Sequence, residues 1–272
     1  MPRVLGVVGS PRKERGLTDR LVGEALAGAD ASGCATQKVY LADLDLEPCV
    51  ACNGGCFQTE VCLHDPAATQ LSALVDRFDA LVLGAPVYTW RQNALTAIFQ
   101  DKLRLTSGSA ITGSLPGKPA LGITVAGGTG SGIFGATQSV YRWFAVWAYR
   151  PLPPILATRY NLDRAAEQAR TAGGQLASAI ETPQPYADLA DCLLYFDSLP
   201  YLREGYADEF FWLARQIDAG LPAEVEDERV LALRAGLRAA EAALASGERE
   251  AAARLVAPAY LAGREAWLDI KG

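Results

Sequence analysis

The sequence predicts a doubly wound α/β fold, a parallel sheet covered by helices on both faces, followed by a helical extension. Short apolar runs rich in β-branched residues alternate with segments of helical periodicity over about two thirds of the chain. One of them, DALVLGAPVY at 79–88, is continuously apolar, as in strands buried on both faces of a parallel sheet. After about Pro185 these runs stop and helical periodicity continues alone.

The expected elements alternate in chain order. Strands are predicted at 3–9, 36–41, 79–88, 118–126 and 152–157. Helices are predicted near 17–26, 71–78, 93–104, 139–148 and 162–180. The chain is therefore expected to divide into an α/β domain at 1–182 and a helical extension at 183–272.

The extension is predicted to contain amphipathic helices. The first helix carries an apolar stripe at helical spacing, and a second stripe follows after the stop and start signals of Gly220 and Pro222. Phe210, Phe211 and Trp212 are expected to be exposed together, which favours a contact between subunits. Covering the cofactor or binding a partner are the alternatives for this extension.

Composition excludes several classes of function. The net charge of −6 argues against nucleic-acid binding, which depends on neutralising phosphates. The sequence contains no run of eighteen or more apolar residues, so no membrane span is predicted. The start of the chain does not have the pattern of a signal peptide, and a cytoplasmic protein is therefore expected. His64 is the single histidine, which argues against histidine triads and histidine-rich metal sites. It is interpreted as a loop residue near a helix cap at Asp65, with a role beside a metal as the alternative.

In an open α/β sheet, ligands bind beyond the carboxyl ends of the strands. The loop after the first strand, GSPRKERGLTDR, offers the hydroxyls of Ser10 and Thr18 and the charges of Arg12 and Lys13 just before a helix. These features suit a phosphate, and the loop matches no dinucleotide or nucleoside-triphosphate motif, so a mononucleotide such as FMN fits better. An ordinary turn with exposed basic residues is the alternative.

Two further loops point to a flat ring. The third strand ends at Pro86 and is followed by Tyr88 and Trp90, aromatic rings that could flank a ligand or simply cap the core. The fourth strand leads into AGGTGSG, where closely spaced glycines allow the backbone to approach a ligand or make a flexible surface loop.

These three loops together resemble the NAD(P)H-dependent FMN reductases, and the added CVACNGGCFQTEVCLHD resembles their iron–sulfur flavoprotein branch. The resemblance covers roughly residues 3–182 and implies a flavodoxin-like, five-stranded sheet of order 2-1-3-4-5. It also implies that Ser10, Arg12, Lys13 and Thr18 hold the FMN phosphate. The ribityl chain and ring would be lined by Pro86, Val87, Tyr88, Trp90, Gly127, Gly128, Thr129, Gly130 and Ser131. The family further implies a homo-oligomer, a dimer or tetramer, in which cluster and flavin communicate across subunits.

Four of the six cysteines lie within fourteen residues, as Cys49-x2-Cys52-x3-Cys56-x5-Cys62. Four thiolates in one loop match the ligand set of a [4Fe–4S] cluster, and the extra residue relative to the compact family spacing falls in the glycine-rich Asn53–Gly55 turn. Zinc, a redox disulfide between the first two cysteines, or remnants of a lost motif are the alternatives. The isolated Cys34 and Cys192 are expected to be small buried hydrophobes.

We therefore expect an FMN-dependent oxidoreductase that passes electrons between a cluster, FMN and a small-molecule or protein partner. The alternatives are a cluster-free NAD(P)H:FMN or quinone reductase, a dehydrogenase of a cyclic secondary metabolite, and a non-enzymatic electron carrier.

Overall fold

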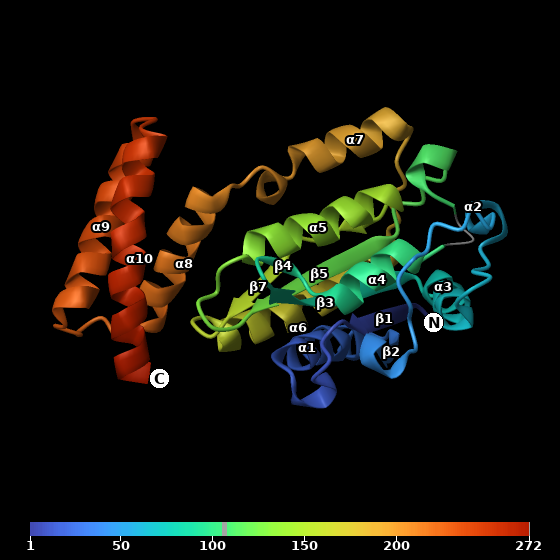
Figure 1. Cartoon of the computed structure of the whole chain (residues 1–272), viewed down its shortest axis with the longest axis horizontal. Helices are drawn as coiled ribbons and strands as arrows, with labels where there is room; N and C mark the ends of the chain where they lie inside the picture. Colours follow the sequence, from blue (N-terminus) through green and yellow to red (C-terminus); the bar gives the residue numbers. More distant parts are fainter. Residues whose placement is uncertain (105–107, 272) are drawn as a thin grey trace.

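The computed structural model describes residues 1–104 and 108–271 and contains the predicted parallel sheet (Figure 1). The strand order is β2-β1-β3-β5, with β6 and β7 both pairing with β5 as the next strand, so the predicted order 2-1-3-4-5 is confirmed. The short β4 adds an antiparallel hairpin to β3. The strands are β1 (Arg3–Val8), β2 (Ala35–Tyr40), β3 (Ala80–Tyr88), β4 (Arg91–Gln92), β5 (Pro119–Ala126), β6 (Arg150–Pro151) and β7 (Ile155–Thr158).

The fifth strand differs from the expectation of one segment at 152–157. It is divided into β6 and β7, with Leu152–Pro154 between them. Pro153 and Pro154 have no amide proton to donate to the ladder, which explains the interruption. The central strands behave as predicted: all of β5 and the first seven residues of β3 are buried.

Helices cover both faces of the sheet. The helices α1 and α6 share one apolar core with one face, and α3, α4 and α5 share another with the opposite face. The helix α5 begins six residues before the predicted 139, directly after its N-cap Gly132, which has a left-handed conformation open to glycine. The bounds are α1 (Leu17–Ala31), α2 (Cys56–Thr59), α3 (Pro66–Asp76), α4 (Ala94–Lys102), α5 (Ile133–Val146) and α6 (Leu162–Glu181).

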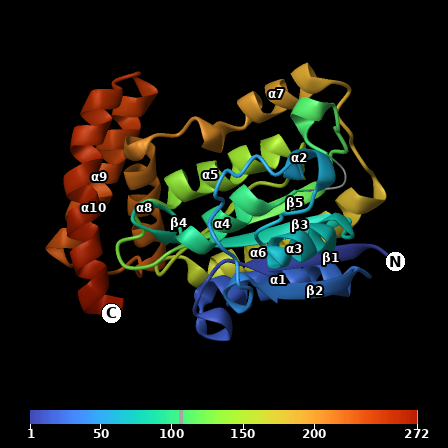
Figure 2. The same cartoon turned by 45° about the vertical axis from the view of Figure 1, so that its right-hand side comes forward.

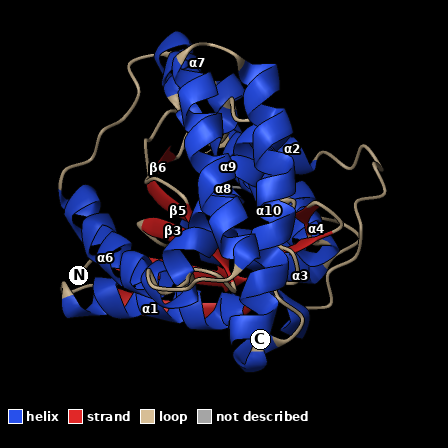
Figure 3. Cartoon of the chain, turned by 90° about the vertical axis from the view of Figure 1, so that its left-hand side faces the viewer, coloured by secondary structure: helices blue, strands red, loops and turns tan. Residues whose placement is uncertain are grey.

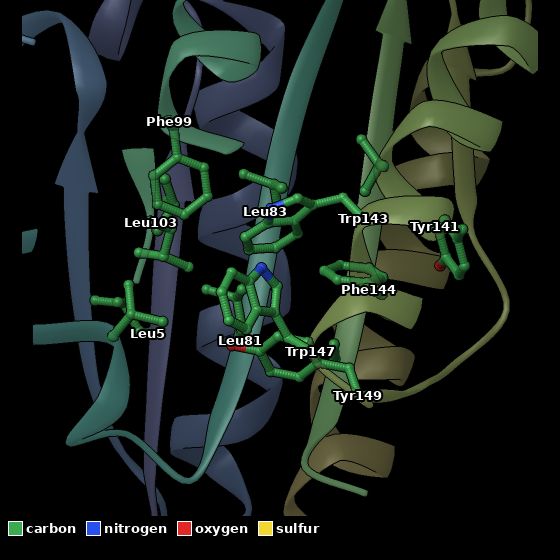
Figure 4. Packing of buried hydrophobic residues seen from close by; sticks show 14 of the residues in the cluster. Leu5, Leu81, Leu83, Phe99, Leu103, Tyr141, Trp143, Phe144, Trp147 and Tyr149 are labelled. Atoms are coloured by element: carbon green, nitrogen blue, oxygen red, sulfur yellow. The ribbon is translucent and has the colours of Figure 1, made fainter. Parts of the chain in front are cut away.

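Aromatic residues of α5 fill the larger core (Figure 4). The ring of Trp143 lies 5.3 Å from Phe99 of α4, and Phe144 lies 5.4 Å from Tyr149. Leu83 of β3 is fully buried in the same cluster. Each fully buried large side chain of this kind contributes about 1.5–3 kcal/mol through removal from water, so this face fixes α4 and α5 on the sheet.

The C-terminal part is helical, as predicted. The helix α7 (Leu189–Ser198) packs beside α5, while α8 (Tyr206–Gly220), α9 (Glu228–Ala245) and α10 (Arg249–Lys271) form a bundle with its own apolar core. Figures 1 and 2 show this bundle beyond the carboxyl ends of the strands, near β4, and Figure 3 shows it in front of the strand ends. Four 3₁₀ turns complete the described elements: η1 (Lys13–Arg15), η2 (Leu41–Asp43), η3 (Ala110–Thr112) and η4 (Pro200–Leu202).

The expected joint exposure of Phe210, Phe211 and Trp212 is wrong. All three side chains are half-buried within the chain itself. The ring of Phe210 lies 4.9 Å from Tyr260 of α10, and Trp212 lies 6.0 Å from Phe134 of α5. These three residues therefore give no support to a contact between subunits.

Candidate functional site

The loop after β1 is tied to the loop after β3 by Asn93. The Asn93 Nδ2 donates to the Gly9 carbonyl at 2.7 Å, and the Gly9 amide donates to the Gly84 carbonyl at 2.8 Å. A Cβ at Gly9 would overlap the Thr96 hydroxyl, so only glycine permits this approach. The buried Asn93 also caps α4 by accepting from the Thr96 amide. The sequence gives no signal for its link to Gly9, because the bond joins residues 84 positions apart.

The residues predicted to hold a phosphate lie around the start of α1. Ser10 and Thr18 are both buried, and the Ser10 hydroxyl accepts from the Arg12 amide at 3.2 Å. The N-cap of α1 is Gly16, which supplies no side-chain cap, so the first amides of this helix remain available to an anion. Lys13 forms an ion pair with Asp43, which raises the pKa of the lysine. Ser10 and Arg12 thus lie beside Gly16 at the start of α1, and Thr18 lies in the first turn of this helix, whereas Lys13 already has an acidic partner.

The predicted aromatic pair lies on a tight hairpin between β3 and β4. Tyr88 pairs with Arg91, and the two residues between them, Thr89 and Trp90, have left-handed φ values of 50° and 64°. Left-handed φ at both central positions is the pattern of a type I′ turn, which normally uses asparagine or glycine. The left-handed backbone of Thr89 and Trp90 is therefore strained, and contacts with the surrounding residues must offset this cost in free energy. Tyr88 and Trp90 remain 46% and 48% exposed at the rim of the sheet.

The glycine-rich loop after β5 has one open end and one covered end. A Cβ at Gly127 or Gly128 would meet no atom within 4 Å. A Cβ at Gly130 would lie 2.6 Å from Leu213 of α8, and the Thr129 carbonyl accepts from the Tyr260 hydroxyl at 2.9 Å. The backbone of this loop can therefore be approached by a ligand on the Gly127–Gly128 side, while the C-terminal helices cover the rest.

Glu209 of α8 holds the end of the same loop. Its two carboxylate oxygens accept from the Gly132 amide at 2.7 Å and the Phe134 amide at 2.8 Å. The side chain is 1% exposed, and burial raises its pKa although the two amides oppose that shift. Glu209 was not among the residues predicted for the site. Its position on the apolar stripe of its helix, four residues before Leu213, was the available signal, because a carboxylate there must be buried with partners.

The four clustered cysteines line one pocket of about 590 Å³, together with His64, Lys102 and Arg104. All four are free thiols, with Cys49 and Cys52 exposed and Cys56 and Cys62 half-buried. The left-handed residues Asn53 and Gly55 lie in the turn where the extra residue was predicted.

Lys102, which lines this pocket, belongs to a buried ion pair. The Lys102 ammonium lies 3.0 Å from a carboxylate oxygen of Asp65 and 3.8 Å from the Cys62 sulfur. Burial lowers the pKa of Lys102, but Asp65 and the nearby cysteines outweigh it and raise the pKa overall. Asp65 caps α3 by accepting from the Ala68 amide, as the sequence predicted for this position.

Within residues 1–104 and 108–271, no group of three or more His, Cys, Asp or Glu side chains is arranged to hold a metal ion. The thiols share a pocket without converging on one point. Their number and chemistry fit a thiolate-bound metal centre, whereas the isolated Cys34 and Cys192 are buried among apolar residues, as predicted.

The cysteine pocket lies at the opposite end of α4 from the three loops. Lys102 is the last residue of α4 and contacts Cys62, whereas Asn93 precedes the helix and contacts Gly9. The nine residue steps from Asn93 to Lys102 span about 13 Å along the helix. Figure 1 shows α2 and the C-terminal bundle at opposite ends of the molecule.

A doubly wound sheet of this order, with three loops meeting at the carboxyl ends of its strands, defines a flavodoxin-like protein. The family described as NADPH-dependent FMN reductase matches residues 2–167, and the chain belongs to this family. It is thus a flavin-dependent oxidoreductase. In the described residues, every helix is too short or too polar to cross a membrane.

The chain is similar to proteins described as iron–sulfur flavoproteins. It is 31% identical over 145 residues to one from Methanocaldococcus jannaschii, covering 53% of this chain and 72% of that protein. It is 27% identical over 145 residues to one from Methanosarcina thermophila, covering 53% and 73%.

Solved structures share the fold at low identity. RosB with a bound 8-demethyl-8-formylriboflavin-5′-phosphate superposes with a TM-score of 0.52 at 15% identity, over 72% of this chain and 86% of that one. An oxidoreductase from Corynebacterium diphtheriae gives 0.50 at 18% identity, over 68% and 99%.

Proposed function

We propose that this oxidoreductase holds FMN in the three loops and an iron–sulfur cluster at Cys49, Cys52, Cys56 and Cys62. Electrons would pass between the cluster, FMN and a small-molecule or protein partner. The observation that carries the proposal is that all four cysteines line one pocket, in a chain similar to iron–sulfur flavoproteins.

The loop residues fit FMN by their chemistry. Ser10, Thr18 and the uncapped start of α1 would bind the phosphate, and the Arg12 guanidinium would balance its charge. Pro86, Val87, Tyr88 and Trp90 would line the ribityl chain and ring. The open backbone at Gly127 and Gly128, with Thr129, Gly130 and Ser131, would face the edge of the ring. Lys13 contributes less than expected, because Asp43 already pairs with it.

When bound, FMN supplies hydride and electron transfer, and a cluster supplies single-electron transfer. The chain's own residues bind, orient and shield these groups. Asn93 fixes the loop at Gly9, and the half-exposed Trp90 on the hairpin would cover one side of the ring. In the cysteine pocket, Lys102 and Arg104 line the same pocket as the thiols, and the Lys102 ammonium lies 3.8 Å from the Cys62 sulfur.

The separation of the two sites along α4 supports an oligomer. A cluster at the Lys102 end of α4 and a flavin at the Asn93 end would be separated by the length of this helix, so a second subunit could bring another cluster closer to the flavin. We therefore propose a dimer or tetramer in which the cysteine pocket of one subunit faces the flavin loops of another. Sedimentation across a range of concentrations tests this, and a monomer at every concentration contradicts it.

Metal and flavin analysis of protein prepared without oxygen tests the cofactors. We expect about one FMN and about four irons per chain, with absorbance beyond the flavin bands. Serine substitution at Cys56 should remove most of the iron and leave the flavin bound. Cys192→Ser is the matched control, since this buried cysteine lies outside the pocket, and it should keep both cofactors.

Each outcome separates the proposal from its rivals. Bound FMN with no iron in the wild-type protein supports a cluster-free flavin reductase instead. Zinc in place of iron contradicts a redox role for the cysteines. Turnover with a protein partner but with no small acceptor favours an electron carrier.

A further inference from the structure

The contacts between the C-terminal helices and the glycine-rich loop are the strongest feature that the proposed function does not use. From here on, the ring-side loop means residues 127–132. It is held by a carboxylate of α8, by a tyrosine hydroxyl of α10 and by direct packing against Leu213. All these holding groups come from beyond residue 182, outside the part of the chain that carries the FMN reductase match at 2–167.

Glu209 makes the most specific of these contacts. A buried carboxylate loses its hydration, and it is tolerated only where hydrogen bonds replace the lost water. Both oxygens of Glu209 accept backbone amides, at 2.7 and 2.8 Å, and the two amides belong to the cap and second residue of α5. These are charge-assisted bonds at the positive end of a helix dipole, which makes them stronger than neutral ones.

The other side of the ring-side loop is fixed by the hairpin. A Cβ at Gly132 would overlap the Trp90 backbone, so loop and hairpin are in direct contact there. The Trp90 ring in turn lies 5.6 Å from Tyr206 and 6.0 Å from Phe210, both on α8. One helix thus contacts both segments proposed to border the flavin ring.

We propose that Glu209 is a positioning residue for the flavin site, and that α8 and α10 form its outer wall. This inference rests on the proposed FMN site and deepens it. Glu209 sets where the Gly127–Gly128 backbone stands relative to the ring, while the contacts of Trp90 with Tyr206 and Phe210 hold the hairpin against α8. Because Glu209 neutralises the start of α5, no bound anion is needed there to order the loop.

The test compares two neighbouring carboxylates of α8. Glu209→Gln keeps the size of the side chain but turns one acceptor into a donor that faces an amide. Asp208→Asn is the matched control, because Asp208 bonds the Gly205 amide and pairs with Arg249, both within the C-terminal helices. Glu209→Asp keeps the charge and tests rescue.

The readouts are the FMN dissociation constant, the reduction potential of bound FMN and hydrogen exchange at the Gly132 and Phe134 amides. We expect Glu209→Gln to weaken FMN binding about tenfold or more, shift the potential and speed exchange at both amides. Asp208→Asn should leave all three close to wild type, and Glu209→Asp should restore part of the potential.

If Glu209→Gln binds no flavin, hydrogen exchange of the FMN-free variant still measures how well the ring-side loop is held. Wild-type FMN affinity and potential retained in Glu209→Gln overturn the inference, and so do equal changes in Asp208→Asn. Wild-type protein that binds no FMN overturns the proposed function itself. In that case the exchange rates still report whether Glu209 holds the loop.

Discussion

Replacing Asn93 with alanine should disturb the flavin site and the fold together. Asn93 is 3% exposed and serves two elements at once. Its Oδ1 accepts from the Thr96 amide and hydroxyl at the start of α4, and its Nδ2 donates to the Gly9 carbonyl. Alanine removes all three bonds and leaves the Gly9 carbonyl without this donor.

The expected magnitude follows from these bonds. Loss of an N-cap costs about 1 kcal/mol, and a buried carbonyl left without its partner costs about 1–3 kcal/mol more. The unfolding free energy should therefore fall by about 2–4 kcal/mol. Asp188→Ala is the matched control, because Asp188 caps α7 through the Asp191 amide at an exposed position. It should cost about 1 kcal/mol.

Urea unfolding of the FMN-free proteins measures both changes, and titration with FMN measures the effect on the site. We expect Asn93→Ala to weaken FMN binding and Asp188→Ala to leave it unchanged. Equal losses of stability in the two variants would refute the assigned role of the Asn93–Gly9 bond. Unchanged FMN affinity in a folded Asn93→Ala protein would show that this bond does not shape the phosphate loop.

Three further predictions concern glycine geometry, the buried ion pair and acid stability. Gly132→Ala should cost more stability in urea than Gly113→Ala, because both have φ near +90° but only the first Cβ would overlap the hairpin. Asp65→Asn should lower the unfolding free energy by about 3 kcal/mol, because it leaves the buried Lys102 ammonium unpaired. An unchanged midpoint of urea unfolding would contradict this. Hydrogen bonding to the arginine two residues later lowers the pKa of Asp227 to about 2, so its stabilising effect is present above its ordinary pKa and lost as the pH falls towards 2. The stability difference between wild type and Asp227→Asn should accordingly shrink on acidification.

The sheet and the loops at its edge could be predicted because their signals are local. Apolar runs ending in Gly9, Pro86 or Gly127 identify a buried strand and the loop that follows it without reference to the rest of the chain. The split of the fifth strand was also readable, in Pro153 and Pro154. Strand order and the FMN residues came instead from the family resemblance.

The contacts of the C-terminal helices could not be predicted in this way. The bond from Glu209 to Gly132 joins residues 77 positions apart, and periodicity within α8 does not say which segment lies opposite. The same limit explains the error over Phe210 and Trp212. They were expected to be exposed, yet α10 covers the first and α5 contacts the second. A stripe identifies a buried face, but only tertiary structure identifies its partner.

The two ends of the candidate site are built from different parts of the chain. The phosphate end, at Ser10 and Thr18, is built only from the first part of the chain, and α4 separates it from the cysteine pocket. The ring end receives Glu209, Leu213 and Tyr260 from the C-terminal helices. Changes within those helices should therefore alter the potential of the flavin and the choice of substrate more than the retention of the phosphate. Among the described contacts, the C-terminal helices therefore act on the proposed ring end and leave the proposed phosphate end to the first part of the chain.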